Sequence, residues 1–181
     1  MNRFTRYILT MGLPVIFFST SPAQAEIKEV LAYADGLYCE FCTLAVLRQI
    51  RVLPGVDKVN LLLRDGAFQI TLKEGHPFQP EEIIRVIGKS SYNFTDMQVL
   101  VTGKNSGGQS LSVPENEVTF KLEDGENMTL KAKKVLDGAA SGELTIIGSY
   151  KVNESDPEKP ILLVESATPG KTTKTSILSE E

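Results

Sequence analysis

Apolar and polar residues alternate over several short stretches of the first hundred residues and follow helical spacing over two others. Alternation is typical of strands, because successive side chains of a strand point to opposite faces. Stretches of this kind or rich in β-branched residues occupy 27–34, 56–63, 67–72 and 93–101. Apolar residues three or four positions apart predict helices at about 41–52 and 80–89.

Turn signals between these stretches support their boundaries. Pro54-Gly55 ends the first predicted helix, and Asp65-Gly66 joins two predicted strands as a hairpin. Pro80, with acidic residues directly after it, is typical of the start of the second helix. The predicted order is strand, helix, strand, strand, helix, strand, which is the ferredoxin-like βαββαβ arrangement.

The pattern changes at a polar, Gly-rich run at 104–110, which we interpret as a linker between a ferredoxin-like domain at 26–103 and a second domain at 111–166. Short β-rich stretches separated by Gly and Asn turns predict that the second domain is small and all-β, OB-like or sandwich-like. Its expected strands are 118–122, 128–135, 142–152 and 161–164. The polar segment 167–181 is predicted to be a disordered tail.

The N-terminus has the features of a secretory signal peptide. Arg3 and Arg6 precede an apolar core at 7–18, and Ala23-x-Ala25 supplies a small-residue cleavage site. We therefore expect 1–25 to be removed and the mature protein to be exported, most simply to a bacterial periplasm. The apolar core falls short of the ~20 residues that a membrane helix needs, and so does every later segment, so no membrane span is expected in the mature chain.

Charge and composition exclude several classes of function. The net charge of −4 and the absence of a basic stripe argue against nucleic-acid binding. A single histidine and the lack of a Gly-rich phosphate loop argue against a hydrolase triad or a nucleotide site. We therefore do not expect an enzyme of these classes.

The two cysteines of the chain, Cys39 and Cys42, lie three residues apart between a predicted strand and a predicted helix. At such a turn both sulfurs can converge on one ion, and the helix N-terminus favours thiolate over thiol. Two soft thiolates without a third ligand suit Cu(I) or Hg(II), whereas Zn(II) prefers four ligands. The lone His76 falls in a loop and is taken as a solvated residue. The spacing predicts a soft-metal site.

Two alternatives remain open for the cysteine pair, because disulfides persist in exported proteins. The protein could be a secreted, non-catalytic interaction module in which Cys39 and Cys42 form a local disulfide. It could also be a thiol–disulfide redox protein. Glu40-Phe41 differs from the Gly-Pro or Pro-His pair usual between redox cysteines, so this is the weaker alternative.

Residues 27–103 resemble the heavy-metal-associated domain found in copper chaperones, metal-transporting ATPases and the periplasmic mercury-binding protein. The resemblance lies in three segments at matching positions of the element order. They are Gly36-x-x-Cys39-x-x-Cys42, Pro54-Gly55-Val56-x-x-Val59 and Ser91-Tyr92. It implies that Cys39 and Cys42 bind the metal ion and that another thiolate protein gives or receives that ion.

Residues around the cysteines depart from the family in part. The chain has Leu37-Tyr38 where the family usually has Met-Thr or Met-His, and Leu37 is expected to replace the Met as a buried loop anchor. In the family fold, the loop after the second helix returns beside the metal loop. Tyr92 and Tyr38 are therefore candidates to lie around the thiolates, while Phe41 is expected in the core.

Overall fold

A computed structural model describes residues 26–105, 109–113, 118–138, 142–156, 159–170 and 177, so the expected signal peptide at 1–25 lies outside the described residues. The first part of the chain contains four strands and two helices. They are β1 (Glu26–Asp35), α1 (Glu40–Arg51), β2 (Val56–Leu62), β3 (Ala67–Leu72), α2 (Glu81–Gly88) and β4 (Asn93–Asn105). The second part contains β5 (Ser110–Val113), β6 (Val118–Asp124), α3 (Leu130–Gly138), β7 (Gly142–Lys151) and β8 (Ile161–Pro169).

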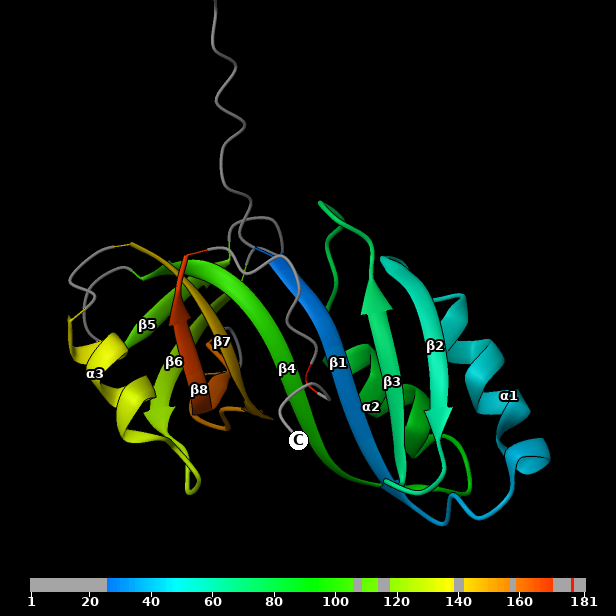
Figure 1. Ribbon diagram of the computed structural model, residues 1–181. Helices are drawn as coiled ribbons and strands as arrows, with labels where there is room; N and C mark the ends of the chain where they lie inside the picture. The colour runs from blue at the N-terminus through cyan, green and yellow to red at the C-terminus, as the bar shows by residue number, and fades with distance from the viewer. Residues whose placement is uncertain are drawn as a thin grey trace, which may run out of the picture.

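All of these strands belong to one continuous sheet in the order β2-β3-β1-β4-β5-β6-β8-β7. Strand β7 also pairs with β4, so β4, β5, β6, β8 and β7 close into a five-stranded barrel. The β6–β8 pair is parallel and the other pairs are antiparallel, which makes the barrel mixed. Figure 1 shows the barrel at one end of the molecule and β1, β2 and β3 extending from it toward α1.

The predicted fold class, a ferredoxin-like βαββαβ domain followed by a small all-β domain, is wrong. The structure is a mixed five-stranded barrel with three further strands and three helices. Strand β4 belongs to both parts, because it pairs with β1 along one edge and with β7 along the other. Strand β8 continues to Pro169 with Ala167 buried, so the expected tail begins inside a strand.

Helix α3 stands where a strand was expected at 128–135, so the second part is not all-β. Its start is capped by Thr129, whose Oγ1 accepts a hydrogen bond from the Ala132 amide at 3.2 Å. Ala132, Val135 and Leu136 face the core at helical spacing. The same segment also alternates between apolar and polar residues, and the cap and the helical face outweigh that alternation.

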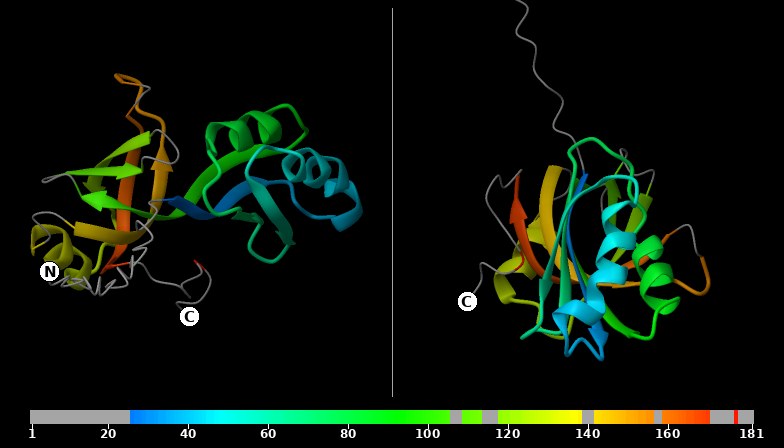
Figure 2. Two further views of the ribbon diagram at one scale, coloured as in Figure 1. Left: turned by 90° about the horizontal axis from the view of Figure 1, so that it is seen from above. Right: turned by 90° about the vertical axis from the view of Figure 1, so that its right-hand side faces the viewer.

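Helices α1 and α2 cover the same face of the sheet, as Figure 2 shows. On α1 the buried residues are Thr43, Val46, Leu47 and Ile50, and on α2 they are Ile83, Val86 and Ile87. The resulting apolar core continues without a break into the barrel, where it includes Phe120, Ile146 and Val164. The helices, the open part of the sheet formed by β1, β2 and β3, and the barrel therefore share one hydrophobic core.

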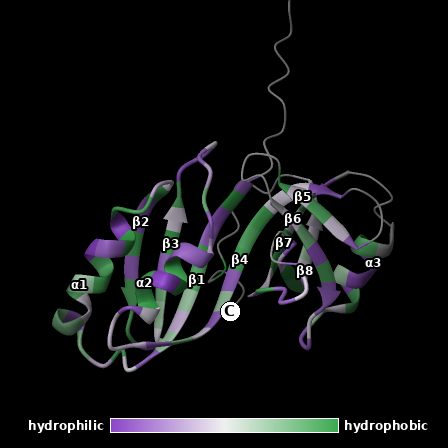
Figure 3. Ribbon diagram, turned by 180° about the vertical axis from the view of Figure 1, so that it is seen from behind, coloured by the Kyte–Doolittle hydropathy of each residue, from purple (hydrophilic) through white to green (hydrophobic). Residues whose placement is uncertain are grey.

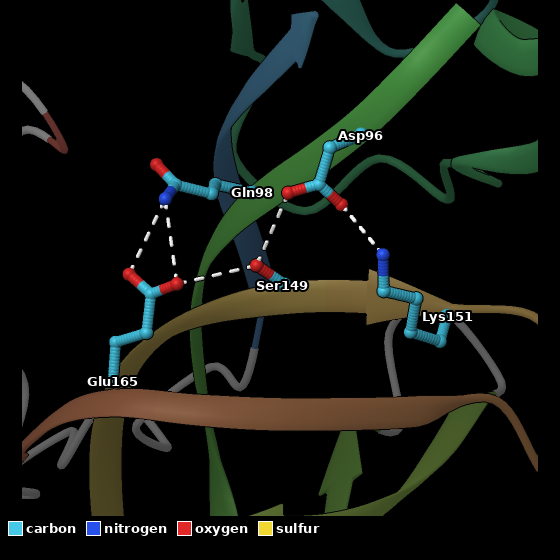
Figure 4. A network of polar contacts seen from close by, with 5 residues as sticks. All are labelled: Asp96, Gln98, Ser149, Lys151 and Glu165. Atoms are coloured by element: carbon cyan, nitrogen blue, oxygen red, sulfur yellow. Dashed lines mark hydrogen bonds and ion pairs between the residues drawn. The ribbon is translucent and has the colours of Figure 1, made fainter. Parts of the chain in front are cut away.

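A network of polar side chains joins β4, β7 and β8 where the open part of the sheet meets the barrel (Figure 4). The Gln98 side-chain amide donates to both carboxylate oxygens of Glu165 at 3.4 and 3.3 Å. The Ser149 hydroxyl lies 3.4 Å from Oδ2 of Asp96 and 3.2 Å from Oε1 of Glu165, and Lys151 pairs with Asp96 at 2.9 Å. These contacts connect β7 and β8 to β4, the strand that both parts of the sheet share.

Tyr33 extends this network to β1. Its hydroxyl donates to Oε1 of Gln98 at 3.3 Å, on the face opposite to that of its buried neighbours Ala32 and Ala34. Burial is the main cause that raises the pKa of Tyr33 above its ordinary value, and the charges of Asp65, Asp96 and Glu165 add to the shift. The phenol therefore stays neutral and acts as a donor among carboxylates.

Tyr150 links the barrel to helix α2. It lies on β7 with its ring edge-on to Phe120, with ring centroids 6.2 Å apart, and its hydroxyl donates to the Glu81 carboxylate at the start of α2. Burial, followed by the hydrogen bond and the charge of Glu81, raises the pKa of Tyr150 far above its ordinary value. The neutral phenol is thus the form that the fold stabilises.

Replacing this phenol tests the link between the barrel and α2. Tyr150→Phe should lower the free energy of unfolding by about 1 kcal/mol near pH 8, because one hydrogen bond is lost. Because the folded-state pKa is raised, the stabilisation is present below about pH 10 and is lost as the pH rises further. Urea unfolding at several pH values should therefore show wild type and variant converging above pH 10. Tyr38→Phe, at an exposed position, is the control. It should change neither the free energy of unfolding nor its dependence on pH.

Candidate thiol site

The loop that carries the cysteines begins where β1 ends at Asp35. Gly36 has a φ of +93°, a conformation that favours glycine, and it turns the chain away from the sheet. Leu37 follows and is only 4% exposed, which confirms the prediction that it anchors the loop in the core. The next three positions, up to the start of α1, lie at the surface or partly exposed.

Cys39 is the N-cap residue of α1. Its backbone is extended, with φ −141° and ψ 117°, and its Sγ accepts a hydrogen bond from the Cys42 amide at 3.2 Å. This is the place that a Ser or Asp side chain usually occupies at a helix start, so a sulfur takes up one of the unpaired amides of the first turn. The fully buried Thr43 holds the same turn, because its Oγ1 donates to the Glu40 carbonyl at 2.7 Å.

Cys39 and Cys42 are joined by a disulfide, with their Cα atoms 5.3 Å apart. The pair is asymmetric, since Cys42 is exposed and Cys39 is partly buried. Figures 1 and 2 place α1 at the end of the molecule farthest from the barrel. The thiol site is therefore at least partly open to solvent. Its two sulfurs lie close enough to share one bond or, when reduced, to converge on one ion.

The sulfurs are the donor atoms that this site offers. Among the residues that the structure describes, no group of three or more His, Cys, Asp or Glu side chains is placed to hold a metal ion. His76 is exposed, as expected, and lies beside Gly55 just beyond the far end of α1. Since α1 spans twelve residues, that end is roughly 18 Å from Cys39 along the helix axis.

Tyr92 and Tyr38, the two aromatic candidates, differ sharply in their surroundings. Tyr92 is buried, and its ring lies against the cysteine loop, because a Cβ added to Gly36 would come within 3.3 Å of its Cδ1 atom. Tyr38 is 91% exposed. The structure thus brings Tyr92 against the loop that positions Cys39 and leaves Tyr38 facing solvent.

Phe41 was expected in the core and is instead 83% exposed, so that prediction is wrong. The buried face of α1 runs through Thr43, Val46, Leu47 and Ile50, which leaves Phe41 on the outer side. The prediction did not count Thr43 as buried, because it is polar. Thr43 nevertheless begins the buried series, which continues at the i+3, i+4 and i+7 positions. In Figure 3 the first turns of α1 show hydrophobic colour, and the turns toward its other end are hydrophilic.

Comparison with protein families found no family model that matches this chain, and no curated protein matches it either. Within the described part of the chain, no helix is long and apolar enough to cross a membrane.

Two glycines with positive φ allow a test of the contact between Tyr92 and the loop. Gly36→Ala and Gly170→Ala both force alanine into a left-handed conformation, at a cost of about 1–3 kcal/mol. An added Cβ at Gly36 meets Tyr92, whereas at Gly170 it meets no atom within 4 Å. We expect Gly36→Ala to lower the free energy of unfolding further than Gly170→Ala in denaturant titrations of the oxidised protein. Equal losses would mean that Tyr92 does not support the loop.

Proposed function

We propose that this protein is exported, binds one Cu(I) or Hg(II) ion between Cys39 and Cys42, and passes that ion to another thiolate protein. The observation that carries the proposal is the placement of two sulfurs side by side at the exposed start of α1. The site supplies two soft donors, which suits ions that accept low coordination numbers. The same pair would leave the coordination shell of Zn(II) incomplete, because Zn(II) prefers four ligands.

The exposure of the site supports transfer as well as binding. Cys42 is exposed, so a thiolate of a second protein can reach the ion without unfolding of the loop. Each ligand exchange replaces one sulfur–metal bond by another, and the ion therefore need not pass through water. A buried site would hold the ion more firmly and release it more slowly.

The oxidation state of the cysteines controls this activity. A metal ligand must be a deprotonated sulfur, and a disulfide provides none, so only the dithiol form binds the ion. The bridged form described above is then the inactive state. Export to an oxidising compartment makes a reductant part of the proposed cycle.

Metal titration of the reduced mature protein tests the proposal. We expect one Cu(I) or Hg(II) ion per chain, with affinity measured by competition against a chelator. Cys39→Ser and Cys42→Ser should each weaken binding by more than the roughly 10- to 100-fold loss typical when a supporting residue around a metal is removed. His76→Ala, remote from the sulfurs, should bind as wild type does.

Two further results complete this experiment. Mild oxidation should abolish binding, and a reductant should restore it. A double variant without either cysteine that binds the ion as tightly as wild type would refute the proposed site.

A second candidate function is a metal-free interaction module, which the exposed aromatic rings favour. Tyr38 and Phe41 flank the disulfide and are among the most exposed large apolar side chains described. Aromatic side chains of this kind often anchor protein interfaces. Measuring the reduction potential of the Cys39–Cys42 pair separates the two functions. A value below about −300 mV, typical of structural disulfides, would favour the interaction module, and a higher value the metal carrier.

A further inference from the structure

The two sulfurs of the thiol site occupy different environments. Cys42 lies on the exposed side of the first turn of α1, and Cys39 is partly buried in the loop that Leu37 anchors. The Cys39 sulfur also accepts the hydrogen bond from the Cys42 amide. Cys42 is therefore the more exposed residue of the pair, and the Cys39 sulfur is held by a hydrogen bond.

This asymmetry decides where a thiol can enter. Thiol–disulfide exchange requires a thiolate to approach one sulfur from the side opposite to the sulfur that leaves. Cys42 is the exposed residue of the pair, so a thiolate reaches it more readily from solvent. Cys39 is less exposed, because it lies directly after Tyr38 and the loop residue Leu37, which is buried in the core.

The hydrogen bond favours the same direction. When the bond between the sulfurs breaks, the leaving sulfur takes the electron pair and becomes a thiolate. Cys39 in this role already has an amide donor in place at 3.2 Å and lies at the positive end of the helix. Cys42 makes no comparable contact with the first turn among the described hydrogen bonds, so it is the poorer leaving group.

We propose that Cys42 is the entry sulfur and Cys39 the anchoring sulfur of this site. An external thiolate attacks Sγ of Cys42 and forms a mixed disulfide, while the Cys39–Cys42 bond breaks and its electron pair stays on Cys39. A second external thiolate then attacks the external sulfur of the mixed disulfide and releases Cys42 as a thiolate. Two external thiols are thereby oxidised to a disulfide, and the cysteine pair gains two electrons.

The same order applies to metal transfer, and this part rests on the proposed function. A thiolate of the receiving protein binds the ion first as Cys42 leaves, and Cys39 leaves last. The partner is thus a protein with an exposed cysteine pair that approaches the outer side of the first turn of α1. Tyr38 and Phe41 flank that approach.

Trapping the first step of reduction tests the assignment. The oxidised mature protein is mixed with glutathione, and the freed protein thiol is alkylated at once with excess vinylpyridine. Fragmentation mass spectrometry then shows which cysteine carries glutathione. We expect the adduct on Cys42 in about tenfold or greater excess, which is the factor given by one charge-assisted hydrogen bond.

The same reaction in guanidinium chloride is the control, because the preference comes from the folded loop and should disappear in the unfolded chain. Equal adducts on both cysteines of the folded protein, or an excess on Cys39, would overturn the assignment. The measurement uses no metal. A failure of metal binding would therefore leave the assignment standing, and a protein that binds metal but reacts at Cys39 would refute the assignment alone.

Discussion

Strand β4 is hydrogen-bonded along both edges, and the rest of the architecture depends on this double pairing. Residues 98–102 of this strand face β1 on one side and β7 on the other. The backbone of this strand therefore both joins the open part of the sheet through β1 and closes the barrel through β7. Because neither part has its own copy of β4, the core between helices and barrel is continuous, and the polar network around Gln98 lies where the two parts meet.

The sequence predicted most helices and turns well, but it did not predict the long-range pairing of β4 with β7 that closes the barrel. Hydrophobic spacing located α1 and α2, and Asp65-Gly66 located the turn between β2 and β3. The boundary expected after residue 103 falls inside β4. Gly103 is a strand residue in a close contact, since a Cβ there would lie 2.7 Å from Cγ of Leu111 and 2.8 Å from the Ser112 carbonyl oxygen. A glycine that packing requires and a glycine that ends an element look the same in sequence.

The candidate site shows the same division between local and long-range information. The Cys-x-x-Cys spacing and the helix after it could be recognised from residue types alone, whereas Leu37 as the anchor was expected from the resemblance to the family loop. The outward position of Phe41 could not be recognised in this way, because it depends on which face of α1 meets the sheet, and that face includes the polar residue Thr43. The packing of Tyr92 on Gly36 brings together residues more than fifty positions apart. No local pattern encodes such a pair, and only the resemblance to a family fold led us to expect Tyr92 beside this loop.

Because Cys39 is the N-cap residue of helix α1, the start of this helix depends on the chemical state of a sulfur atom. A hydroxyl or carboxylate cap keeps its chemical form, but a sulfur cap changes whenever it is oxidised, loaded with an ion or modified. Each change alters the acceptor offered to the Cys42 amide and hence the order of the first helical turn. Under the proposed function, a docking protein that contacts this turn would distinguish the loaded from the empty form through the shape of the backbone, without touching the ion.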